Sequence, residues 1–223
     1  MNDLEKYFLQ NKARVIHKFH HYFEIYERHL ARFRNQDICI VEIGVGDGGS
    51  LQMWRDYFGA KAKIVGIDIS VDIQISEPQI RLIHGDQSDG EFLRALPVII
   101  DKGIDILIDD GSHINGDQVK TFEALYHHLK SDGVYICEDL QTSYQDQFGG
   151  GYLKSGTFIE RMKAAIDELN AWAAEPNTGH LKNGFTRTTH SMHFYPYMVV
   201  IEKRPMDIVM RSPVVSGGSH VQP

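Results

Sequence analysis

The chain has 223 residues and a formal net charge of −7. This length fits one α/β domain with a buried core and excludes two domains of ordinary size. The acidic balance counts against a nucleic-acid partner, so a small-molecule substrate fits better. We expect neither a signal peptide nor a membrane partner, because no apolar run is long enough to span a bilayer. Both cysteines fall in expected buried strands, and the chain is predicted to be cytoplasmic.

Residues 1–36 precede the first expected strand and form a predicted N-terminal helical extension. Apolar side chains recur every three or four residues from Ile16 to Phe33, which is the spacing of one helix face. Such a helix packs either on its own domain or on a second copy of the chain. We favour the first arrangement because the pattern has too few heptads for a coiled coil, and a homo-oligomer remains an alternative.

The segment ICIVEIGVGDGGS, residues 38–50, combines an apolar run with four glycines. A continuous apolar run is typical of a parallel strand covered on both faces. Gly44 and Gly46 allow a sharp turn that brings backbone N–H groups close to a ligand, and Ser50 can cap the helix that follows. Glu42 precedes the glycines, as is typical of the methyltransferase version of this nucleotide loop. We therefore assign all four residues to cofactor binding.

The second expected strand ends at Asp68, where a carboxylate can hold the two hydroxyls of a ribose. NAD enzymes and S-adenosylmethionine enzymes share this arrangement, so it leaves both cofactors open. The strand expected over 79–83 leads to Asp86 and Gln87, which we predict to face the cofactor. Asp89 is placed to cap the next helix.

Acid pairs follow both the fourth and the fifth expected strand: Asp109 with Asp110, and Glu138 with Asp139. The carboxyl ends of parallel strands lie at one edge of a sheet, so these carboxylates would converge and repel one another unless a cation lay between them. Asp110, Glu138 and Asp139 form a predicted oxygen site for Mg²⁺, Mn²⁺ or Ca²⁺. Asp109 is assigned to cofactor binding. The alternative is that these four residues are separate surface acids that share no ion.

The order of elements predicts an α/β fold. We expect a Rossmann-like doubly wound sheet of seven strands, mostly parallel with an antiparallel C-terminal hairpin, and helices on both faces. A polar loop over 141–156 opens from the acid pairs and is typical of a lid. The expected later elements are a helix over 117–130, a helix over 157–173, and hairpin strands over 185–193 and 197–202.

The motifs at the strand ends resemble a known family. The segments EIGVGDGGS at 42–50, IDDGSH at 108–113 and EDLQTSY at 138–144 look like those of the metal-dependent O-methyltransferases that modify sugars, of the mycinamicin and tetracenomycin type. The resemblance covers roughly residues 38–202. It implies a class I methyltransferase fold, S-adenosylmethionine as donor, and His113 as the base. It also implies a magnesium ion held by Asp110, Glu138 and Asp139.

The expected function is S-adenosylmethionine-dependent, Mg²⁺-dependent (or Mn²⁺-dependent) methyl transfer to a hydroxyl of a small molecule, a sugar or natural product. A hydroxyl is a poor nucleophile until it loses its proton, and an imidazole such as His113 can accept that proton. Capping of the next helix would also explain His113. The methyltransferase domain is placed at 37–203, after the extension at 1–36 and before a flexible C-terminal tail at 204–223. An NAD-dependent oxidoreductase and a non-catalytic nucleotide-binding module are the alternatives.

Overall fold

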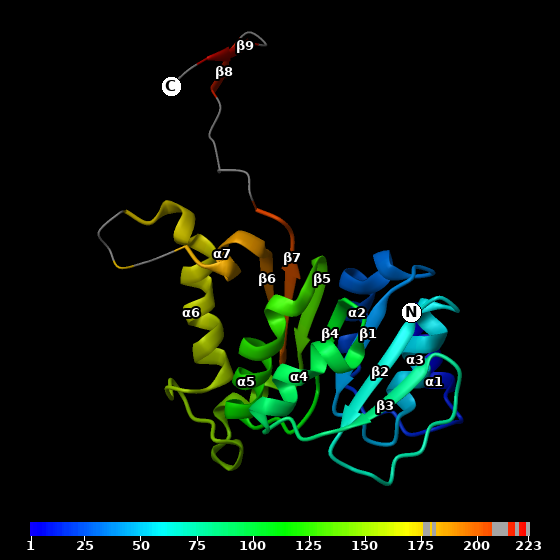
Figure 1. The fold of residues 1–223 in the computed structure, drawn as a ribbon. Coiled ribbons are helices and arrows are strands. Elements are labelled where there is room, and N and C mark those ends of the chain that lie inside the picture. Colours follow the sequence, from blue (N-terminus) through cyan, green and yellow to red (C-terminus); the bar gives the residue numbers. More distant parts are fainter. Residues whose placement is uncertain (176–178, 180–181, 207–213, 217–218, 222–223) are drawn as a thin grey trace.

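The computed structural model describes residues 1–175, 179, 182–206, 214–216 and 219–221. Its main sheet has seven strands in the order β3-β2-β1-β4-β5-β7-β6 (Figure 1). The first five strands are parallel, and β7 and β6 complete the sheet as an antiparallel pair, so the predicted fold class is confirmed. The strands are β1 Cys39–Ile43, β2 Lys63–Asp68, β3 Ile80–His84, β4 Ile104–Asp109, β5 Leu129–Cys137, β6 Thr189–Tyr195 and β7 Met198–Lys203.

Helices cover both faces of the sheet, and each face has its own hydrophobic cluster. Alternate residues of a strand point to opposite faces, so Ile40 packs with the first three helices while Val41 packs with the next three. The first group is α1 Asp3–Gln10, α2 Tyr22–Leu30 and α3 Gly49–Phe58. The second group is α4 Gly90–Ile100, α5 Asn115–Leu125 and α6 Phe158–Asn170.

The strand order reverses beside β1, and this reversal positions the site. β1 lies between β2 and β4, and all five of its residues are buried. The connections from β1 and from β4 therefore leave the same sheet edge in opposite directions, which opens a crevice at the carboxyl ends of these strands. The glycine-rich loop that follows β1 and Asp110, which follows the last residue of β4, both lie at this crevice.

The N-terminal extension corrects one prediction. Residues 11–21 contain no helix, and α2 begins only at Tyr22, so the helix expected from Ile16 onward is wrong over its first part. We call residues 11–21 the strap. Its backbone is engaged elsewhere, because the Val15 N–H donates to the Asp47 carboxylate at 2.8 Å. The second part of the pattern packs on the domain as favoured, with Phe23, Tyr26 and Leu30 buried.

Other element boundaries also differ from the sequence expectations. The segment from 184 to 188 is the short helix α7 Gly184–Thr188, which begins in a capping box between Asn183 and Thr186. The helix expected over 117–130 runs instead from Asn115 to Leu125. Two 3₁₀ turns, Leu140–Tyr144 and Asp146–Phe148, form part of the predicted lid.

Of the predicted flexible tail, much lies outside the described residues, and its flexibility remains a prediction. The described parts are 204–206 and a separate hairpin of β8 Val214–Ser216 and β9 Ser219–Val221.

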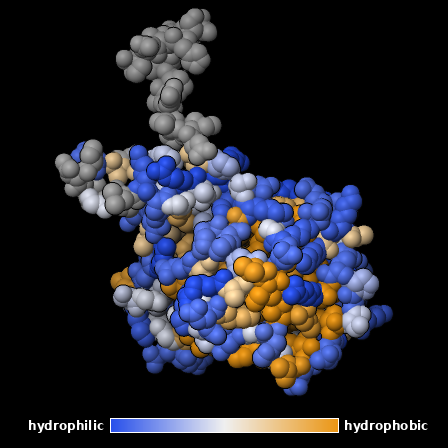
Figure 2. All heavy atoms as spheres, in the orientation of Figure 1, coloured by the Kyte–Doolittle hydropathy of each residue, from blue (hydrophilic) through white to orange (hydrophobic). Residues whose placement is uncertain are grey.

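Hydrophilic residues dominate the face in Figure 2, and hydrophobic ones gather near α4, where Val98 is exposed. Within the described ranges no helix is both long enough and apolar enough to cross a membrane.

Candidate active site

A cavity of about 520 Å³ lies at the carboxyl edge of the sheet, between the glycine loop, the ends of β2 and β4, and the strap. Most of the predicted site residues border it, including His113, Asp110 and Asp139. Six of the eight predicted cofactor residues line it: Gly44, Gly46, Ser50, Asp68, Asp86 and Gln87. The sequence therefore located the pocket, and its size is that of a small-molecule site.

The glycine loop is tightly enclosed on one side and open on the other. Gly44 has a φ of +85°, and a Cβ there would lie 1.9 Å from the carbonyl oxygen of Asp110. A Cβ at Gly49 would lie 2.4 Å from the carbonyl oxygen of Val15 in the strap. At Gly46, by contrast, a Cβ would meet no atom within 4 Å. The loop thus fits between the end of β4 and the strap and exposes its middle to the cavity.

Gly44→Ala is expected to lower the free energy of unfolding by more than about 3 kcal/mol. Its Cβ would collide with the backbone of Asp110, and the alanine would also have to adopt a left-handed conformation. Gly46→Ala is the matched control. It also requires a positive φ but has open space, so a loss of about 1–2 kcal/mol is expected. Urea denaturation of the two variants measures the difference, and equal losses would contradict the close approach of Gly44 to Asp110.

Asp68 holds the glycine loop from the end of β2. Its Oδ2 atom accepts the N–H groups of Val45 at 2.8 Å and Gly46 at 3.2 Å. Asp86 lies across the cavity, where hydrogen bonds from Ser88 lower the pKa of its carboxyl group. Two carboxylates therefore face the cavity from neighbouring strand ends.

Glu42 does not line the cavity, although the sequence predicted a cofactor contact. Its side chain is completely buried and accepts hydrogen bonds from the Ser50 hydroxyl at 2.7 Å and the Trp54 indole at 3.2 Å. Both donors belong to α3. Glu42 therefore fixes the start of that helix, and Ser50, which does border the cavity, is also tied to it.

Asp109 is likewise buried away from the cavity, so the structure does not bring this predicted cofactor residue to the site. It accepts a hydrogen bond from Gln87 Nε2 at 2.6 Å, and burial raises its pKa to about 7. Gln87 Oε1 in turn accepts the N–H of Ser112 at 2.8 Å. Since successive strand residues alternate in direction, Asp109 braces the turn from behind while Asp110 faces the crevice.

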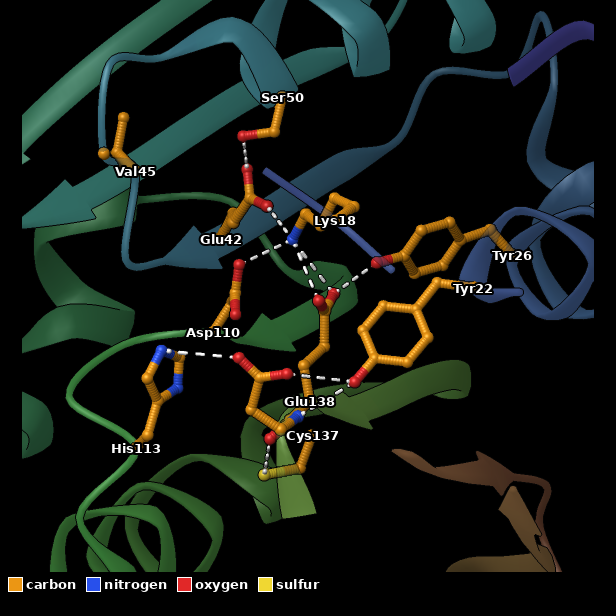
Figure 3. Close-up of polar contacts among 12 residues, drawn as sticks. Lys18, Tyr22, Tyr26, Glu42, Val45, Ser50, Asp110, His113, Cys137 and Glu138 are labelled. Atoms are coloured by element: carbon orange, nitrogen blue, oxygen red, sulfur yellow. Dashed lines mark hydrogen bonds and ion pairs between the residues drawn. The ribbon is translucent and has the colours of Figure 1, made fainter. Parts of the chain in front are cut away.

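The predicted metal ligands Asp110, Glu138 and Asp139, which we call the rim carboxylates, all border one small hollow of about 60 Å³ beside the main cavity. Sequence reasoning missed Lys18 of the strap, which borders the same hollow (Figure 3). Its ammonium lies 2.7 Å from Asp110 Oδ2 and 3.1 Å from both Glu138 oxygens. It also lies 3.0 Å from Glu42 Oε1. The structure thus brings the three predicted ligands together at one hollow, with the ammonium of Lys18 bound to Asp110 and Glu138.

Two tyrosines of α2 orient the rim carboxylates. Tyr26 donates to Glu138 Oε1 at 2.6 Å, and Tyr22 donates to Asp139 Oδ1 at 3.1 Å. Burial raises the pKa of Glu138 well above its ordinary value, the neighbouring Asp110 adds to this, and Lys18 acts in the opposite direction. Burial also raises the pKa of Asp110. One ammonium therefore leaves this group of carboxylates short of positive charge.

The rim carboxylates fit a divalent cation. Among the described residues, the three carboxylates of Glu42, Asp110 and Glu138 share the one ammonium of Lys18, so two negative charges remain unbalanced when all these groups are ionised. On the cavity side, Asp110, His113 and Asp139 offer ligand atoms that lie within 4.8 Å of one another. Carboxylate oxygens are the donors that Mg²⁺ and Mn²⁺ prefer.

His113 faces Asp139 across the crevice, with 3.5 Å between His113 Nε2 and Asp139 Oδ2. Both residues have left-handed backbone conformations, with φ of 58° and 57°. Such conformations are uncommon for residues other than glycine and concentrate at functional sites. Helix capping is excluded as the role of His113, since the N-cap of α5 is Ile114 and no side chain caps it. Among the described residues, the buried Nδ1 atom of His113 has no hydrogen-bond partner.

Asn115 is a second residue that sequence reasoning missed. Its amide donates to the carbonyl oxygens of Thr142 at 3.1 Å and Phe148 at 3.0 Å, and its oxygen accepts the N–H of Phe158 at 2.8 Å. It therefore fastens the predicted lid at both ends. An asparagine at a helix start reads as an ordinary local residue, so the sequence carried no signal for this role.

No family model matches the chain. It is 39% identical over 193 residues to the 8-demethyl-8-alpha-L-rhamnosyl tetracenomycin-C 2'-O-methyltransferase of Streptomyces olivaceus, covering 83% of this chain and 50% of that protein. It is 36% identical over 188 residues to the mycinamicin VI 2''-O-methyltransferase of Micromonospora griseorubida, covering 80% of this chain and 47% of that protein. The chain spans about half the length of the curated relatives it matches.

Solved structures give the same relationship. The MycE methyltransferase from the mycinamycin biosynthetic pathway, in complex with Mg and SAH, superposes with a TM-score of 0.82 at 33% identity. The match covers 92% of this chain and 54% of that one. The chain is therefore a homologue of the sugar O-methyltransferases of the tetracenomycin and mycinamicin type and has their Rossmann-like methyltransferase fold.

Proposed function

We propose that the protein is an S-adenosylmethionine-dependent, Mg²⁺-dependent O-methyltransferase whose acceptor is a hydroxyl of a sugar or natural product. The observation that carries the proposal is the opening of His113 and two of the rim carboxylates, Asp110 and Asp139, onto the cavity of the glycine loop. One MycE structure is a complex with Mg, SAH and mycinamycin VI, which supports the same ligand classes here.

The residues that line the cavity fit the methyl donor. Asp68 would accept hydrogen bonds from the ribose hydroxyls at the end of β2. Asp86 and Gln87 would lie beside the adenine, and the open surface at Gly46 leaves room for the rest of the donor. Mg²⁺ would be held by the rim carboxylates Asp110, Glu138 and Asp139.

The chemistry requires removal of a proton from the acceptor hydroxyl. When bound, the donor supplies the methyl group, and the divalent ion supplies positive charge that favours the ionised hydroxyl. His113 accepts the hydroxyl proton, and Asp139 at 3.5 Å stabilises the imidazolium that forms. Tyr22 keeps Asp139 in place through its hydrogen bond. Both residues have a left-handed backbone, and their side chains face one another across the crevice.

Asp68→Ala is expected to weaken binding of S-adenosylmethionine and its demethylated product by at least about tenfold, since a charged hydrogen-bond partner that lines the cavity is lost. Isothermal titration calorimetry measures both ligands. Asp72→Ala is the matched control, because Asp72 lies in the same segment, is exposed and does not border the cavity. Binding of NADH with no binding of either sulfur ligand would overturn the proposed function in favour of an oxidoreductase.

A further inference from the structure

The side chain of Lys18 is only 2% exposed, and its ammonium group lies among three carboxylates (Figure 3). An ammonium has three N–H donors, and Glu42, Asp110 and Glu138 all lie within 3.1 Å of it. The nearest oxygens of these three carboxylates lie between 2.7 and 3.1 Å from Lys18 Nζ. The ammonium is therefore a cation held in place by three acidic side chains.

The strap holds this cation in place from both ends. At one end, Val15 and Arg14 donate to Asp47 of the glycine loop, at 2.8 Å and 2.9 Å. At the other end, the His21 ring hydrogen-bonds the carbonyl oxygen of Pro196 at 2.9 Å. Lys18 lies between these anchors. Its position is thus set by the backbone of the strap as well as by the charges around it.

Lys18 contacts the same oxygens that the proposed metal site uses. Asp110 Oδ2 and both Glu138 oxygens already accept hydrogen bonds from the ammonium. Lys18 also borders the 60 Å³ hollow of the rim carboxylates. A divalent ion bound there must share these oxygens with the ammonium or displace it, and in both cases the two positive charges oppose each other.

We propose that Lys18 is a positioning residue that acts as the resident counter-ion of the site: it keeps Glu42, Asp110 and Glu138 assembled before a divalent ion binds, and it weakens the binding of that ion so that the ion exchanges readily. This inference rests on the proposed function, which places the ion at the rim carboxylates. The inference predicts the direction in which metal affinity changes when Lys18 is replaced. Loss of a resident counter-ion tightens metal binding, whereas loss of a purely structural lysine disorders the ligands and weakens metal binding.

The test is a titration of the wild type and of Lys18→Met with Mn²⁺, in which the electron paramagnetic resonance signal reports free Mn²⁺. Lys18→Met is expected to bind Mn²⁺ at least about tenfold more tightly, because a positive charge within a few ångströms of two ligands is removed. Lys130→Met is the matched control. Lys130 pairs with Asp105 at 2.8 Å near the opposite end of β4, and its loss is expected to leave Mn²⁺ affinity unchanged. Unchanged or weaker Mn²⁺ binding by folded Lys18→Met overturns the inference.

Thermal melting keeps the test decisive when Lys18→Met is unstable. With the counter-ion gone, the variant is expected to melt below the wild type in EDTA and to gain more from Mn²⁺ than the wild type gains. An equal or smaller gain overturns the inference.

The double variant Lys18→Met/Glu42→Gln removes one charge of each sign and is expected to bind Mn²⁺ within about threefold of the wild type. Loss of Mn²⁺ binding by a folded double variant also overturns it.

The wild-type titrations separate this inference from the proposed function. A wild type that binds neither Mn²⁺ nor S-adenosylhomocysteine contradicts the proposed function itself. A wild type that binds both, together with Lys18→Met of unchanged Mn²⁺ affinity, contradicts only the role of Lys18.

Discussion

Asp110→Asn is expected to lower the rate of methyl transfer by on the order of 10²- to 10³-fold, the loss that follows removal of one preorganised electrostatic group from an active site. The substitution keeps the size of the side chain but removes a charge from a residue that borders both the cavity and the hollow of the rim carboxylates. Addition of Mg²⁺ after treatment with EDTA is expected to restore the wild type and to restore this variant far less. Transfer of labelled methyl groups to an acceptor measures both rates.

The control for this experiment lies on the same strand. Asp105 is also buried in β4, but it accepts the N–H of Cys39 and pairs with Lys130 at the opposite end of the strand. Asp105→Asn is expected to cost stability and to keep both the rate and the response to Mg²⁺. Full wild-type activity in excess EDTA, or a normal rate for Asp110→Asn, would remove the metal from the proposed mechanism and leave the fold assignment intact.

The sheet and the location of the site were predictable from the sequence because both depend on local pattern. The apolar run before Gly44 and the run before Asp110 are buried strands whose carboxyl ends meet at one edge, as the rule for open α/β sheets requires. The charge argument predicted a positive partner for the acid pairs, and the structure places Lys18 beside one acid of each pair. It did not identify Lys18 as one such partner, because that residue lies 92 positions from Asp110.

The parts that could not be predicted depend on contacts between distant segments. The helical spacing that begins at Ile16 was misleading, because hydrogen bonds to Asp47 outweigh helix formation in the strap. A signal was available for Asp109. Alternation along β4 places it and Asp110 on opposite sides, so only one of the two can face the crevice. For Glu42, the buried hydrogen bonds to α3 are visible only in the structure.

Replacement of His113 is expected to lower the methyl-transfer rate by about 10²- to 10⁴-fold, the usual contribution of a general base. His113→Asn is the preferred variant, because asparagine tolerates the left-handed backbone at this position and cannot act as the base. The affinity of this variant for Mn²⁺ and S-adenosylhomocysteine is expected to stay within a few-fold of the wild type. Loss of the imidazole affects proton transfer rather than binding of the donor. The rise in rate with pH that reports one deprotonation is expected to disappear.

The matched control for His113 is His84→Ala. His84 follows the same pattern of a histidine at a strand end, but its ring hydrogen-bonds the carbonyl oxygen of Ile69 at 2.8 Å and does not border the cavity. Its replacement is expected to leave the rate and its pH dependence unchanged. A near-normal rate for His113→Asn across the pH range would assign the proton to another group. His17 is then the next candidate, because it borders both the cavity and the hollow of the rim carboxylates.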